Sequence, residues 1–287
     1  MSWQPYRSAG LGDQPGTFWV WRDFPSPELG NARDIVVWAP PPSPEIAHAR
    51  LPVLYFQDGQ NVLDAETSHA GSWRAAHALA ELARSGHGAL AVAVAHTGEG
   101  RLAEYSPFTD ALGRGGRGDA YLDFLASSVK PAVDARFPTR REASSTGLVG
   151  SSLGGLIAVY GVFKRPDAFG LAAALSPSFW FADDAMARWL EDQERVPSQI
   201  YLDSGRFERG RGRPWWPWHL GSWRYARSVR RVHRRLLRMG YVDGVDLCCL
   251  LDPEGEHREE CWRRRLPGAL SFLLVESTST GAWAIPD

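Results

Sequence analysis

A short segment near the middle of the chain places one serine where a nucleophile could act. Gly150-Ser151-Ser152-Leu153-Gly154 is a G-x-S-x-G sequence centred on Ser152, between a strand-like run over 146–150 and a helical pattern. A turn this tight requires glycine at its flanks and lifts the serine hydroxyl to the helix N-terminus. There the helix dipole and the free N–H of Leu153 stabilise developing negative charge. Ser152 is therefore the candidate nucleophile and Ser151 is not; the alternative is a glycine-rich turn with a capping serine.

A serine nucleophile needs a general base, and enzymes with such a turn place a histidine last in the chain order Ser, acid, His. Of the eight histidines, only His257 follows the last predicted strand, over 245–251. It lies in a glycine-containing loop before the final helix, and such a loop can bring an imidazole over the C-terminal edge of a sheet. His257 is therefore the first candidate for the base, and His219, in an aromatic segment, is the second.

Two carboxylates compete for the role of the acid that orients the base. Asp203 ends the predicted strand 199–203, and Glu208 lies five residues further on. An orienting carboxylate must reach over the strand end to the next loop, which gives the later position more freedom. The spacing from Gly205 to Glu208 also resembles the G-x-x-D found here in hydrolases with the same turn. We favour Glu208, and the alternative role of Asp203 is a buried carboxylate that holds neighbouring loops by hydrogen bonds.

Strands and helices alternate from residue 51 onward, and this alternation predicts the fold. Parallel strands need crossover connections, so the pattern favours a mainly parallel sheet with helices on both faces. Two earlier strands, 17–21 and 34–38, have no helix between them and are expected to form an antiparallel edge. No repeat or long linker divides the chain, so residues 1–287 are expected to form one α/β domain. The other predicted strands are 51–56, 89–95, 146–150, 171–176, 199–203 and 245–251, and the predicted helices are 72–84, 119–135 with a kink or break at Pro131, a helix after residue 152, 223–239 and 259–275.

The composition narrows the partners and the compartment. The formal net charge is −1, so no overall field attracts nucleic acid or a membrane surface. No run of about 18 apolar residues is present and the N-terminal segment lacks the apolar stretch of a signal peptide, so we expect a soluble, cytoplasmic protein. The three cysteines suit reduced thiols. Cys248, Cys249, Cys261 and His257 do not predict a zinc site, because adjacent strand residues point to opposite faces, and no metal is expected.

Residues 206–240 contain 11 Arg and one acid, Glu208, interleaved with tryptophans. We expect 206–223 to be a loop over the site, followed by the amphipathic helix. Arg and Trp together suit carboxylates and aromatic rings, so Trp215 and Trp218 are candidates for substrate binding. The same composition fits a solvated helix face, and also single-stranded nucleic acid, which the net charge disfavours.

Taken together, these residues resemble the putative-esterase branch of the α/β-hydrolase superfamily, which is related to enterochelin esterases, feruloyl esterases, S-formylglutathione hydrolases and mycolyltransferase antigens. The resemblance runs from about residue 29 to residue 275. The segments that carry it are Leu29-Gly30-Asn31-Ala32-Arg33, Pro52-Val53-Leu54-Tyr55 with Asp58-Gly59-Gln60-Asn61, Arg101 with Glu104-Tyr105-Ser106-Pro107, Gly150 to Gly155, Ser176-Pro177-Ser178-Phe179-Trp180, Tyr201-Leu202-Asp203-Ser204-Gly205, and Gly255-Glu256-His257 with Glu259, Trp262 and Arg265.

The resemblance implies an α/β-hydrolase fold without metal or organic cofactor, and it implies roles for individual residues. The chain departs from the family after Gly205, where many relatives have Thr-Lys-Glu and this sequence has Arg206-Phe207-Glu208. The segment from Ser176 to Trp180 is expected to reach the rim of the site. The implied roles are Ser152 as nucleophile, His257 as base, Leu153 and either Gly59 or Gln60 as donors of the two oxyanion N–H groups, and Asp58 and Trp180 as substrate contacts.

These roles predict hydrolysis of a carboxylic ester. His257 takes the proton of Ser152 as the serine oxygen attacks the carbonyl, two N–H groups hold the oxyanion, and water then hydrolyses the acyl-enzyme. Two other functions stay open: an acyltransferase with the same residues, and a non-catalytic α/β-hydrolase-fold module that binds an anionic partner through the Arg/Trp segment. The tryptophans favour a small-molecule ester with a bulky or aromatic group over a long lipid.

Overall fold

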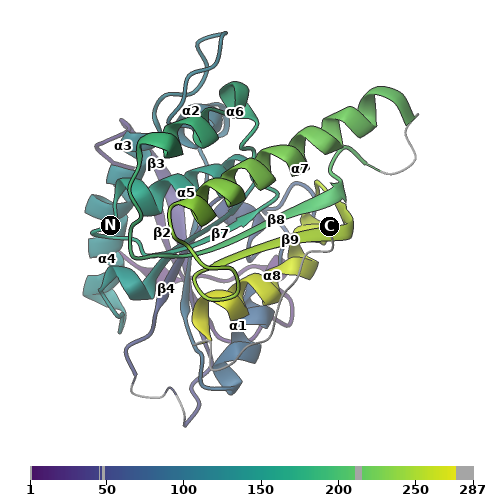
Figure 1. The fold of residues 1–287 in the computed structure, drawn as a ribbon. Coiled ribbons are helices and arrows are strands. Elements are labelled where there is room, and N and C mark those ends of the chain that lie inside the picture. Colours follow the sequence, from purple (N-terminus) through teal and green to yellow (C-terminus); the bar gives the residue numbers. More distant parts are fainter. Residues whose placement is uncertain (1, 45, 47–48, 211–214, 276–287) are drawn as a thin grey trace.

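A computed structural model describes residues 2–44, 46, 49–210 and 215–275 of the chain. Its described residues contain one nine-stranded sheet with the strand order β1-β2-β3-β5-β4-β6-β7-β8-β9. The pairs β1–β2, β2–β3 and β3–β5 are antiparallel, and every pair from β5 to β9 is parallel (Figure 1). The mainly parallel sheet with an antiparallel N-terminal edge is therefore confirmed. The strands are β1 (Gln4–Pro5), β2 (Thr17–Ser26), β3 (Asn31–Ala39), β4 (Val53–Phe56), β5 (Leu90–Val94), β6 (Thr146–Ser151), β7 (Leu171–Leu175), β8 (Gln199–Phe207) and β9 (Leu247–Glu256).

Helices cover both faces of this sheet, as the alternation predicts. In β4 the side chains of Val53 and Tyr55 pack into one apolar layer and those of Leu54 and Phe56 into the other. This alternation follows from the pleat of a strand that is buried on both faces. Helices α1 (Ala75–Arg84) and α8 (Glu259–Leu274) lie together on one face. The other face packs against α3 (Gly118–Asp123), α4 (Lys130–Arg136), α5 (Leu153–Lys164), α6 (Phe181–Trp189) and α7 (Trp215–Arg238), whereas the short α2 (Arg101–Glu104) follows β5 near the C-terminal edge of the sheet.

The helix predicted over 119–135 changes its winding in the middle. A π-helical segment, Phe124–Val129, joins α3 to α4, and Pro131 lies at the start of α4. Proline has no N–H to donate and its ring crowds the preceding turn, so a locally wider turn relieves the conflict. The predicted disturbance at Pro131 therefore takes the form of a π-helical turn just before it.

The prediction that 206–223 is a loop is wrong in part. β8 continues to Phe207, and the polypeptide is already helical at Trp215, so α7 begins eight residues earlier than residue 223. Pro217 is compatible with this helix, because it lies in the first turn of α7, where the missing N–H has no helical acceptor to lose. The amphipathic helix expected over 223–239 is the C-terminal two thirds of α7, whose residues Val229, Val232 and Leu236 are buried in the core.

Candidate active site

Ser152 occupies a strained turn between β6 and α5, at the C-terminal edge of the sheet. Its φ of 56° and ψ of −123° are unusual for a residue with a side chain. A Cβ at Gly150 would lie 2.5 Å from the carbonyl carbon of Gly154, and one at Gly154 would lie 2.9 Å from Cβ of Gln57. Both flanking positions therefore require glycine, as the motif predicts. This backbone exposes Ser152 at the N-terminus of α5.

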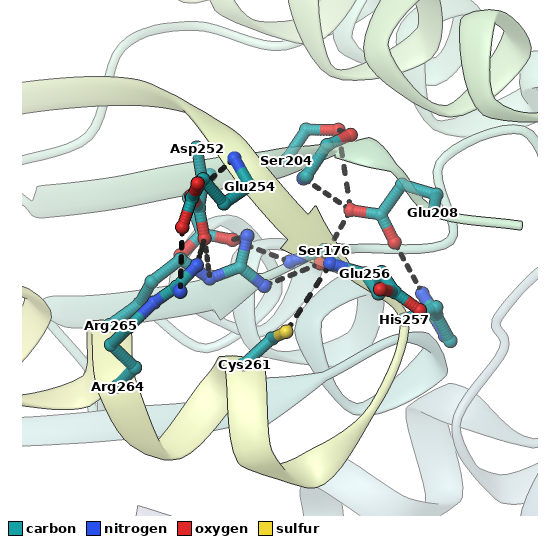
Figure 2. A network of polar contacts seen from close by, with 12 residues as sticks. Ser176, Ser204, Glu208, Asp252, Glu254, Glu256, His257, Cys261, Arg264 and Arg265 are labelled. Carbon is teal, nitrogen blue, oxygen red and sulfur yellow. Dashed lines mark hydrogen bonds and ion pairs between the residues drawn. The ribbon is translucent and has the colours of Figure 1, made fainter. Parts of the chain in front are cut away.

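His257 follows the last residue of β9 and contacts the carboxylate that the sequence favours. Its Nδ1 lies 2.7 Å from Oε2 of Glu208, so this bond fixes one ring nitrogen (Figure 2). Tyr225 of α7 lies against the imidazole, with ring centroids 5.0 Å apart, and Trp262 of α8 packs edge-on against it at 4.9 Å. The imidazole is thus held by one hydrogen bond and two aromatic side chains.

Glu208 is held as a carboxylate by several donors. Its side chain is fully buried, with an exposed fraction of 0%. Oε1 accepts hydrogen bonds from Oγ of Ser176, at 2.7 Å, and from the N–H of Gly205, and Oε2 faces His257. Burial alone would raise the pKa of Glu208, but the bonds from His257, Ser176 and Gly205 outweigh it and bring the pKa below its ordinary value.

Asp203 points elsewhere and has other partners. Its Oδ1 accepts the N–H of Ser176 at 2.8 Å and lies 3.3 Å from Nη1 of Arg265, while Oδ2 accepts the hydroxyl of Tyr201 at 3.2 Å. Within the described residues, no hydrogen bond joins Asp203 to His257. Burial raises the pKa of Asp203 to about 6, although the charge of Arg265 opposes the rise. These contacts match the alternative that the sequence leaves open, a buried carboxylate that holds neighbouring loops.

The hydroxyl of Ser152 has a partner that the sequence does not predict. Its Oγ lies 3.0 Å from Oγ of Ser178, in the loop between β7 and α6. The N–H of Ser178 also donates to the carbonyl of Ser152 at 2.8 Å. Across the part of the chain that the structure describes, no hydrogen bond connects Ser152 Oγ to His257. Catalytic hydrogen bonds are often long before substrate binds, so this geometry is compatible with a nucleophile and its base.

The loop after β4 carries the residues expected to complete an oxyanion hole. Gly59 and Gln60 begin a short 3-10 turn, Gly59–Asn61. A Cβ at Gly59 would lie 2.4 Å from the carbonyl carbon of Ala93, so glycine lets this loop pack directly on β5.

Asp58, which the sequence predicts as a substrate contact, forms an ion pair with Arg101. Arg101 binds its two carboxylate oxygens, with Nε at 2.5 Å and Nη2 at 2.7 Å, and the Asp58 side chain is only 6% exposed. The Asp58 N–H also donates to the hydroxyl of Tyr105 at 2.9 Å. The carboxylate thus holds the loop through Arg101, and the expected contact of Asp58 with substrate stays a prediction.

A cavity of about 600 Å³ opens at Ser152. Trp180 lines this cavity, and so do Arg224 and Tyr225 of α7. The side chains of Trp215, Trp218 and His219 lie outside the described residues, and their proposed contacts stay predictions. The cavity lining comprises Leu102, Thr109, Asp110, Ala111, Leu112, Arg114, Ser152, Leu153, Ser178, Trp180, Phe181, Ala182, Asp183, Arg224 and Tyr225.

The cysteines lie apart from this cavity. Cys248 packs in the apolar layer under α8 and Cys249 in the opposite layer, as alternation along β9 requires. Among the residues that the structure describes, no group of three or more His, Cys, Asp or Glu is arranged to hold a metal. None of the described helices combines the length and hydropathy needed to span a bilayer.

The sequence missed Ser178 and Tyr225 as site residues. Ser178 lies in a segment expected at the rim, but nothing in its spacing distinguishes it from Ser176. Tyr225 lies near the start of the helix predicted over 223–239, in α7. Its place against His257 depends on how α7 crosses the sheet, and a one-dimensional pattern does not contain that information.

Comparisons with known proteins agree with the fold. A family model described as a putative esterase matches residues 26–273. The chain is 26% identical over 238 residues to YbbA, an uncharacterised protein of Bacillus subtilis, a match that covers 80% of this chain and 88% of that one. It is 36% identical over 140 residues to the siderophore triacetylfusarinine C esterase of Aspergillus fumigatus, which covers 46% of this chain and 45% of that protein.

Among solved structures, the enterobactin esterase of Shigella flexneri is similar, with a TM-score of 0.66 and 19% identity. That match covers 91% of this chain and 59% of the enterobactin esterase, so the chain spans less than two thirds of its length. The likeness shows a shared fold. The family model covers most of the chain, so the chain belongs to the putative-esterase family, as the sequence predicts, and the relatives named for an activity are ester hydrolases, the class of enzyme expected here.

Proposed function

We propose that this ester hydrolase works through Ser152 as nucleophile, His257 as general base and Glu208 as the acid that orients the base. The observation that carries the proposal is the 2.7 Å bond between His257 Nδ1 and Glu208. That bond leaves Nε2 as the ring nitrogen that can take a proton from the nucleophile. The strained turn that presents Ser152 at the same edge of the sheet supports the assignment.

The proposed reaction has two halves. Ser152 leaves its partner Ser178, gives its proton to His257 and attacks the ester carbonyl. The N–H of Leu153 and that of Gly59 or Gln60 donate hydrogen bonds to the negatively charged carbonyl oxygen. Each bond lowers the activation free energy by an amount on the order of 3 kcal/mol. His257 returns the proton to the leaving alcohol, and water then hydrolyses the acyl-enzyme by the same steps.

We propose esters of the siderophore class as substrates. Two relatives are named for siderophore esters, triacetylfusarinine C and enterobactin. The cavity supports a bulky substrate with aromatic or acidic groups, because it combines the rings of Trp180, Phe181 and Tyr225 with the guanidinium groups of Arg114 and Arg224.

The test is hydrolysis of short p-nitrophenyl esters by the wild type and by Ser152→Ala, each in EDTA, with a fluorophosphonate label mapped by mass spectrometry. We expect turnover that survives EDTA, is lost in Ser152→Ala and is accompanied by a label on Ser152. Transfer of the acyl group to an added alcohol in preference to water would make the chain an acyltransferase with the same residues. Absence of both turnover and label from the folded wild type would favour the non-catalytic binding module.

A further inference from the structure

Ser176 connects the two carboxylates behind the candidate site. It directly follows β7, is fully buried and has a φ of 45°. Its N–H donates to Asp203 at 2.8 Å, and its Oγ donates to Oε1 of Glu208 at 2.7 Å. One residue in a strained backbone conformation thus fixes the spacing between Asp203 and Glu208.

Arg265 reaches this serine from α8 (Figure 2). Its side chain is 4% exposed, and Nη2 donates to Oγ of Ser176 at 2.8 Å. Nη1 lies 3.3 Å from Asp203, and Nε lies 3.9 Å from Asp252. A buried guanidinium requires anionic or polar partners, and the two aspartates supply the charge.

The contacts give the hydrogen bonds a fixed direction. Arginine can only donate, so Ser176 Oγ must accept from Arg265. The only proton of the Ser176 hydroxyl is then directed to Glu208. The chain of donors therefore runs from Arg265 through Ser176 to Oε1 of Glu208, which leaves Oε2 free to face His257.

We propose that Arg265 and Ser176 are positioning residues for catalysis, which hold the Glu208 carboxylate in the orientation that His257 needs. The inference rests on the proposed function, because it requires Glu208 to orient the base. If Arg265 only stabilised the fold, its ion pair with Asp203 would be enough to balance the buried charge. The additional bond to Ser176 links the arginine to the site, although neither residue is among those that line the cavity at Ser152.

The test measures kcat and KM for Ser176→Ala, Arg265→Met and Arg265→Lys, each in the wild-type background and in Glu208→Gln. Hydrogen bonds to charged groups imply a loss of about 10- to 100-fold in kcat for Ser176→Ala and Arg265→Met, with little change in KM. Arg265→Lys keeps the charge and is expected to recover part of the loss. In Glu208→Gln the same substitutions are expected to have almost no further effect, because they act through Glu208.

The matched control is Arg263→Met, which removes the same charge from the exposed side of α8. It should leave kcat near the wild-type value. An equal loss from Ser176→Ala in both backgrounds, or no loss in the wild-type background, would overturn the inference. Ser176→Ala removes a single hydroxyl, so it carries the test where Arg265→Met does not fold. A Glu208→Gln variant with full activity would instead refute the acid assigned under the proposed function, and active Ser152→Ala would refute its nucleophile.

Discussion

The hydroxyl of Ser152 is paired with the hydroxyl of Ser178, 3.0 Å away, and not with the imidazole of His257. Ser178 is almost fully buried, with an exposed fraction of 1%, and its backbone N–H is bonded to the Ser152 carbonyl as well. The pairing holds the candidate nucleophile in a resting orientation. Attack on an ester requires Ser152 to break this bond and turn its proton toward His257.

Replacement of Ser178 by alanine should therefore speed up acylation. An interaction that exists only before the reaction raises the barrier, and a hydrogen bond between neutral groups contributes about 0.5–1.5 kcal/mol. We expect Ser178→Ala to react about 2- to 10-fold faster with a fluorophosphonate, measured as a second-order rate of inactivation. Ser145→Ala, remote from the cavity, is the control. Slower labelling of Ser178→Ala would mean that this hydroxyl assists the reaction.

The two candidate acids should separate clearly by mutation. Glu208→Gln keeps the shape of the side chain but removes the charge that orients His257, and the loss of an orienting carboxylate lowers kcat by about 10⁴-fold in a well-studied serine protease. Asp203→Asn leaves the His257–Glu208 bond in place, so its loss in kcat should stay below about 10-fold, although the loss of one of the two carboxylates near the buried Arg265 destabilises the fold. Steady-state kinetics and thermal melting of both variants check this. A larger kcat loss in Asp203→Asn would reverse the assignment.

Much of the fold and the core of the candidate site could be predicted because they depend on short-range patterns. The apolar strand before Gly150 and the glycines around Ser152 dictate the turn, and the chain order dictates which histidine to choose. Glu208 was favoured because of its reach beyond the strand end, and its bond to His257 agrees with that argument.

The rest could not be predicted because it depends on how distant elements pack. The start of α7 at Trp215 could not be predicted from the residues around it. Proline occurs both in loops and in the first turn of a helix, so Pro217 does not distinguish the two. The sequence pattern does not predict that Arg101, in the short helix that follows β5, binds both carboxylate oxygens of Asp58. Ser178 meets Ser152 because β6 and β7 are neighbours in the sheet, so the loop after β7 lies beside the turn after β6. The sequence pattern does not contain this pairing.

Arg224 is expected to favour anionic esters. It lines the cavity from α7, and no ion pair of Arg224 with a carboxylate is present in residues 2–44, 46, 49–210 and 215–275, whereas Arg114 is held by Asp110. Because an exposed ion pair contributes about 0.2–1 kcal/mol, Arg224→Gln should lower kcat/KM for a carboxylate-bearing aryl ester by about 2- to 5-fold and leave the neutral analogue unchanged. Arg227→Gln is the control, since that exposed guanidinium lies over Trp223. Equal losses on both esters would exclude a role in charge selection.

Asp203 should make the stability of the fold depend on pH between about 4 and 6. Burial raises its pKa from 3.8 to about 6, so the folded protein binds this proton more tightly than the unfolded chain does. Its contribution to stability is therefore fully present below its ordinary pKa and is lost as the pH rises through about 6. Asp203→Asn cannot titrate, so its free energy of unfolding should fall less than that of the wild type over this interval. Urea unfolding of both proteins at pH 4, 5, 6 and 7 measures the two slopes, and parallel slopes would show that Asp203 keeps an ordinary pKa beside Arg265.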